Sequence, residues 1–175
     1  MAQPPQDAQE QVLGYARHQA KKSLTDLAAL MERSGVDCAR CIEGVSEAQA
    51  RFSGAEKWTV KDVLAHLISV SRAVNSDLRN LAEEKPPKRL EAEPGMNPGT
   101  TASIDKLRSD LTELWRETRE LVASLPEDGS VNATRPHPWF GPLNFREWIA
   151  FQRVHAMDHI QQIEKIKADP AYPGE

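Results

Sequence analysis

The sequence lacks most of the features that direct a chain to a membrane, a nucleic acid or an oxidising compartment. Only 6% of its 175 residues are aromatic, and acidic residues outnumber basic ones, 26 to 22, for a net charge of −4. No stretch approaches the roughly 18 consecutive apolar residues of a membrane span, and the basic residues form no cluster of the kind that binds nucleic acid. We therefore expect a cytoplasmic protein with neither a nucleic-acid nor a membrane partner.

Cysteine is also scarce. The two cysteines, Cys38 and Cys41, form one C-x-x-C pair, which is too little for the disulfide framework of a small secreted domain. Such a pair can serve redox chemistry or bind a soft metal, but here it lies in a helical pattern and on its apolar side. We predict that both are buried small residues, and a contribution to a metal site stays open.

What the chain has in abundance is helix-forming residues, with no β-branched runs to compete. Its length suits one domain, which we place at residues 1–175 with a core of about 9–167. Apolar residues recur with the helical period in four long segments. The predicted helices are residues 9–44 with a possible break at Gly35, residues 59 to 85, residues 103–125 and residues 144–167, with a short turn at 46–52. Four amphipathic helices bury their apolar faces against one another, so we predict an all-α four-helix bundle.

Local signals fix two of the helix starts, and prolines mark two long loops. Thr59 with Asp62, and Asn144 with Glu147, have the spacing of capping boxes. Residues 85–100 hold four prolines and two glycines and are predicted to be a surface connection. Residues 127–143 contain three prolines beside His137, Trp139 and Phe140, so we expect an irregular loop that packs over one end of the bundle.

Histidine carries the strongest chemical signal. His155 and His159 are four residues apart on the apolar face of the last predicted helix, and His66 flanks the apolar face of the second. A buried imidazole without a partner costs about 1 to 3 kcal/mol, which either hydrogen bonds within the core or a shared metal ion would offset. Three histidine ligands leave one coordination position open, as in catalytic zinc sites. We expect a divalent metal site at these three residues.

Other polar residues near these positions have two interpretations each. Gln162 lies on the same helical face and would orient a ligand or contact a bound molecule, unless it is merely solvated. Asp62, one turn before His66, would steady that ring or simply serve as a helix-start carboxylate. His137 would contact a substrate or pack within its loop, and His18 is expected to be exposed.

Three segments resemble the DinB-like, or YfiT-like, superfamily, and the resemblance spans most of the chain. They are Lys57-Trp58-Thr59-Val60-Lys61-Asp62-Val63-Leu64-Ala65-His66-Leu67, then His137-Pro138-Trp139-Phe140-Gly141-Pro142-Leu143, and His155-x-x-x-His159-x-x-Gln162-Ile163. The resemblance implies a four-helix bundle whose metal ligands are His66, His155 and His159. It also implies thiol-dependent enzymes, such as mycothiol-dependent isomerases and bacillithiol transferases, or metal-dependent hydrolases, and a homodimer is common among such relatives.

Two functional hypotheses follow. In the first, a metal-dependent enzyme binds Zn²⁺, or secondly Ni²⁺, since imidazole nitrogen suits these ions better than Mg²⁺ or Ca²⁺. It would activate water, as a hydrolase, or a low-molecular-weight thiol cosubstrate, as an S-transferase, on a small-molecule substrate. The pattern shows no inward carboxylate to serve as a general base, which weakens hydrolysis. In the second, the same bundle is a non-catalytic metal-binding or interaction protein.

Overall fold

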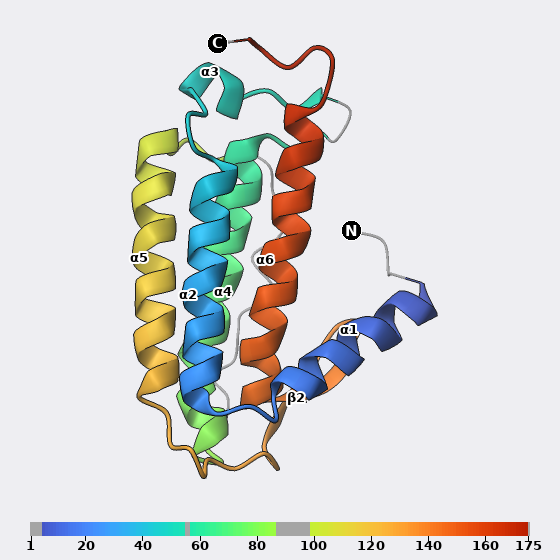
Figure 1. Cartoon of the computed structure of the whole chain (residues 1–175), viewed down its shortest axis with the longest axis vertical. Helices are drawn as coiled ribbons and strands as arrows, with labels where there is room; N and C mark the ends of the chain where they lie inside the picture. The colour runs from blue at the N-terminus through green and yellow to red at the C-terminus, as the bar shows by residue number, and fades with distance from the viewer. Residues whose placement is uncertain (1–4, 55–56, 87–98, 175) are drawn as a thin grey trace.

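The computed structural model describes residues 5–54, 57–86 and 99–174, and these ranges contain six helices and one two-stranded sheet (Figure 1). The elements are α1 (Gln6–Gln19), α2 (Leu24–Cys41), α3 (Glu47–Ala50), α4 (Val60–Ala82), α5 (Ile104–Ala123), β1 (Thr134–His137), β2 (Gly141–Asn144) and α6 (Phe145–Lys167). The mostly helical fold agrees with the predicted all-α class. None of the helices in the described ranges is long and apolar enough to cross a membrane.

The four long helices lie side by side (Figure 1). Helix α2 packs against α5 and α6, and α4 packs against the same two helices. The interior between them is mainly aliphatic, and its largest fully buried side chains include Leu27, Met31, Leu64, Leu67, Leu78, Leu81, Leu114, Ile149 and Ile163. Burying each such side chain contributes about 1.5 to 3 kcal/mol. This core holds α4 and α6, which carry the three histidines, against each other.

The predicted starts of the last three long helices are confirmed. Thr59 accepts a hydrogen bond from the Asp62 amide while the Asp62 carboxylate accepts one from the Thr59 amide, and Asn144 and Glu147 form the same reciprocal pair before α6. Ser103 caps α5. Each cap stabilises its helix by about 1 kcal/mol, so both histidine-bearing helices begin at fixed residues.

The first predicted helix, 9–44, is wrong in one respect, because the break does not fall at Gly35. The chain leaves α1 after Gln19 and restarts at α2, where the Ser23 hydroxyl accepts a hydrogen bond from the Asp26 amide. Helix α1 runs in a different direction from the four long helices and packs against one of them, α6 (Figure 1). Helix α2 continues straight through Gly35, which is there for packing: a Cβ at this position would lie 2.8 Å from Cβ of Trp115 in α5.

Gly35→Ala is therefore expected to destabilise the protein by about 1 to 3 kcal/mol, since the added methyl group forces α2 and α5 apart. Gly14→Ala is the matched control, because a Cβ at Gly14 in α1 meets no atom within 4 Å. There the substitution is expected to stabilise by about 0.5 to 1 kcal/mol through helix propensity alone. Urea denaturation measures both. Stabilisation by both substitutions would contradict the close contact at Trp115.

The loop predicted at 127–143 is corrected, because its second half forms a β-hairpin. Strands β1 and β2 pair antiparallel with Arg135 opposite Leu143 and Pro136 opposite Pro142. In a two-stranded sheet both strands are edges, so prolines are tolerated where their missing N–H faces outward. The chain from α5 passes the lower ends of the helices before reaching the hairpin beside α6 (Figure 1). Of the other predicted loop, 85–100, residues 87–98 lie outside the described residues.

Candidate metal centre

The structure brings together the three histidines that the sequence singled out. His66 comes from α4, and His155 and His159 come from successive turns of α6. One ring nitrogen from each lies within 4.8 Å of the other two, and Nε2 of His155 lies 2.9 Å from Nε2 of His159. Two ligands of a tetrahedral zinc ion at 2.0 to 2.1 Å are about 3.3 Å apart. The cluster is therefore close to the spacing that one ion requires.

The three histidines differ in exposure. His159 is only 1% exposed, whereas His66 and His155 are half-buried. The ring centroid of His66 lies 5.4 Å from that of His155 and 5.0 Å from that of His159. His159 is thus the most buried of the three, and His66 and His155 keep partial exposure.

All three imidazoles are neutral at pH 7. Burial lowers the pKa of His66 to about 4, with the nearby His159 as the second cause. Burial also lowers the pKa of His155 well below its ordinary value, and the neighbouring histidines add to the effect. For His159, burial lowers the pKa while the Gln162 hydrogen bond opposes the shift. Neutral imidazole is the form that binds a metal ion, so no proton must first be removed at pH 7.

Gln162 selects the tautomer of His159. The Gln162 Oε1 atom can only accept, so the Nδ1–H of His159, 3.0 Å away, donates to it. Nε2 of His159 then carries a lone pair directed toward Nε2 of His155. Outer contacts of this kind fix a ligand's orientation and raise its basicity, and the orienting role expected for Gln162 stays a prediction.

Asp62 takes the simpler of its two expected roles. Its carboxylate accepts hydrogen bonds from the amide and hydroxyl of Thr59 and from the amides of Gly99 and Thr100. These bonds fasten the start of α4 to the chain that leads into α5. Outside the histidine cluster, His66 contacts Trp58, whose ring packs edge-on at 5.5 Å between centroids. The sequence places Trp58 just before the helix, but helical periodicity gives no sign of its contact with His66.

His137 belongs to an aromatic cluster beside the three histidines. Its ring lies 4.6 Å from that of Phe151 and 4.7 Å from that of Phe140, and its Nδ1 accepts a hydrogen bond from the Trp139 amide. Burial, with Arg135 as a second cause, lowers the pKa of His137 to about 4. Phe151 in turn stacks on His155, with centroids 6.3 Å apart. A substrate contact by His137 stays a prediction.

The cysteines take the buried role predicted for them. Both are buried, and burial is the main cause that raises the pKa of each thiol to about 12. The Cys41 thiol lies 3.4 Å from Oε1 of Glu164, to which it donates. Within the described part of the chain, the metal-ligand group comprises the three histidines and neither cysteine. His18, as expected, is exposed.

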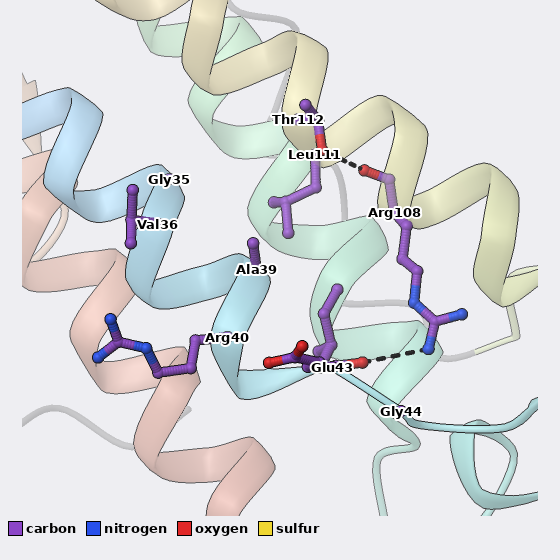
Figure 2. Close-up of a pocket in the computed structure, with 10 residues that line it drawn as sticks. Gly35, Val36, Ala39, Arg40, Glu43, Gly44, Arg108, Leu111 and Thr112 are labelled. Carbon is purple, nitrogen blue, oxygen red and sulfur yellow. Dashed lines mark hydrogen bonds between the residues drawn. The ribbon is translucent and has the colours of Figure 1, made fainter.

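A groove of about 470 Å³ lies elsewhere, between α2 and α5 (Figure 2). Its lining includes the apolar residues Gly35, Val36, Ala39 and Leu111 and the charged residues Arg40, Glu43 and Arg108. The Arg108 guanidinium donates to the Ile42 carbonyl at 3.1 Å, so this side chain serves the end of α2. The lining residues include no histidine, and the groove is separate from the metal-ligand group.

Comparison with known proteins agrees with this geometry. A family model described as the DinB superfamily matches residues 30–163, a range that contains all three histidines. The chain is also similar to an uncharacterized Bacillus subtilis protein named YuaE, with 26% identity over 129 residues, which cover 65% of this chain and 79% of that protein. The relative's name carries no activity, so the chemistry must be argued from the residues of the site.

Proposed function

The chain belongs to the DinB superfamily, and from that premise we propose that it is a metal-dependent enzyme that holds one divalent ion through His66, His155 and His159 and acts on a small molecule. On the same premise we assign α2, α4, α5 and α6 to the four-helix bundle of the family. The observation that carries the proposal is the convergence of three neutral imidazole nitrogens within 4.8 Å of one another.

The donor set fits a transition metal. Three imidazoles suit Zn²⁺ first and Ni²⁺ second, whereas Mg²⁺ and Ca²⁺ prefer oxygen ligands. Within the described residues the group contains no carboxylate or thiolate as a fourth ligand, which suits an open rather than a closed site. When bound, the ion would supply Lewis acidity toward water or a thiol at that open position.

The chain's own residues supply orientation. His159 is held by Gln162 through its Nδ1–H, and its burial keeps it fixed at the back of the site. His66 and His155 are the partly exposed members of the set, so a substrate would approach from their side. With no acidic residue in the group of ligand atoms, acid or base catalysis would fall to a solvent-derived group or to a residue outside that group. This arrangement suits thiol transfer at least as well as hydrolysis.

Elemental analysis of the tag-free protein tests the proposal. We expect close to one equivalent of zinc or nickel per chain, lost in a His155→Ala, His159→Ala double variant. His18→Ala is the matched control, because His18 is exposed on α1 and should leave the metal content unchanged. If the wild-type protein stays metal-free after reconstitution, the three histidines are core residues and the proposal fails. With the metal established, assays of ester hydrolysis and of thiol consumption separate the two reactions.

A further inference from the structure

Aromatic rings gather around the histidines although the protein has few of them. The chain has four tryptophans, four phenylalanines and two tyrosines. Five of these ten side chains lie in ring contact with His66, His137 or His155: Trp58, Trp139, Phe140, Trp148 and Phe151. Most of the other buried side chains between the long helices are aliphatic, with Phe145 and Trp115 as buried aromatic exceptions. Half of the aromatic rings of the chain thus contact these histidines, and Trp148 and Phe151 among them also belong to the hydrophobic core.

Two of these rings contact the partly exposed histidines of the site. Trp58, in the chain before α4, packs edge-on against His66 at 5.5 Å. Phe151, in α6, lies parallel to His155 within 16°. The rings of His66 and His155 contact each other, and His159 closes the back. Trp58 and Phe151 thus each contact one of the two partly exposed imidazoles.

The other rings of the aromatic cluster pack around Phe151. Phe140, from the hairpin, lies 5.2 Å from Phe151, and His137 lies 4.6 Å from it. Trp148, one turn earlier in α6, contacts the same ring edge-on at 5.8 Å. Phe151 is consequently held from three sides, and it is 8% exposed. Its orientation is fixed before any ligand arrives.

We propose that Trp58 and Phe151 select a ligand that carries a flat apolar group, an aromatic ring or a conjugated system, next to the atom that binds the ion. Aromatic rings attract one another in stacked and edge-on arrangements with centroids 4.5 to 7 Å apart, and each of the two residues is in ring contact with an imidazole that would bind the ion. This inference rests on the proposed function, and it names the chemical class of the substrate. A purely structural role, in which Trp58 anchors the start of α4 and Phe151 anchors the hairpin, predicts no such selectivity.

Cobalt-loaded protein provides a test that does not require an activity. Co²⁺ replaces zinc and reports its ligands by visible absorption, so binding of acetohydroxamate and benzohydroxamate can be titrated directly. The two compounds share the same chelating group and differ in a methyl against a phenyl. We expect the phenyl compound to bind about tenfold more tightly to the wild-type protein. Trp58→Leu and Phe151→Leu should each reduce this preference to about two- to threefold, and Trp139→Leu, whose ring contacts His137, should preserve it.

The possible outcomes distinguish a failure of the selectivity for a flat apolar group from a failure of the metal site itself. Equal binding of the two hydroxamates to cobalt-loaded wild-type protein overturns the inference and leaves the metal site intact. An unchanged preference in both leucine variants assigns Trp58 and Phe151 a structural role and also overturns it. Failure of the wild-type protein to bind Co²⁺ overturns both. Thermal unfolding and the cobalt spectrum identify any variant that has lost its fold, and the second variant then decides.

Discussion

Arg135→Met is expected to lower the free energy of unfolding by about 3 to 5 kcal/mol, the cost of removing one partner from a buried ion pair. Nη1 of Arg135, in β1, lies 3.2 Å from the carboxylate of Asp77, in α4, and the Asp77 side chain is 1% exposed. The guanidinium also lies over the Trp148 ring, 5.1 Å from its centroid. Without the guanidinium, the Asp77 carboxylate either keeps its charge in a poorly hydrated place or takes up a proton, and both destabilise the folded protein by a similar amount.

The double variant Asp77→Leu, Arg135→Met distinguishes this explanation from a general loss of packing. Replacing both members of a buried pair by apolar side chains is often neutral or stabilising, so the double variant should be much more stable than Arg135→Met alone. Arg116→Met is the matched control, because Arg116 pairs with Glu113 and Glu120 on the exposed face of α5. It should change stability little. Urea denaturation midpoints at constant slope measure all three, and a small effect of Arg135→Met would contradict the role given to the pair.

Gln162→Leu is expected to weaken zinc binding by about 10- to 100-fold, the usual effect of removing the partner that orients a histidine ligand. The substitution removes the acceptor of the His159 Nδ1–H and leaves that proton buried without its hydrogen bond. His159 would then favour the other tautomer, in which the proton sits on Nε2, where the metal should bind. Competition with a chromophoric chelator gives the dissociation constant.

Two further variants make the result specific. Gln162→Glu keeps an acceptor for the same N–H and should retain affinity near or above that of the wild-type protein. Gln161→Leu makes the same change at the exposed neighbouring position of α6, so it should leave binding unchanged. A Gln162→Leu protein that binds zinc as tightly as the wild-type protein would show that the His159 contact has no influence on the metal.

Local chemistry decided which parts of the structure the sequence could predict. Thr59 with Asp62, and Asn144 with Glu147, act within one helical turn, and the predicted starts of α4 and α6 agree with the structure. The pair His155 and His159 is equally local, because residues four positions apart in a helix are neighbours on one face wherever the helix packs. Their approach to His66 is tertiary, and helical periodicity gave only the correct face for each ring.

The predictions that were wrong concern features that depend on contacts between residues far apart in the sequence. Gly35 lies in the middle of α2 because Trp115, far along the chain in α5, occupies the space of a side chain. The real break, at Ser23, has an ordinary cap, but the apolar period continues across it and hides the change in direction. The hairpin forms where prolines argue for an irregular loop. The hairpin is held by Asp77 in α4, which is far from it in the sequence, and by Trp148 in α6, which follows its second strand.

The placement of the ligands along the chain has a consequence for biosynthesis. His66 leaves the ribosome about 90 residues before His155 and His159, which belong to the last helix. A nascent or truncated chain without α6 has His66 but neither of the other two proposed ligands. The proposed site would therefore bind a metal ion stably only after α6 has docked against α4.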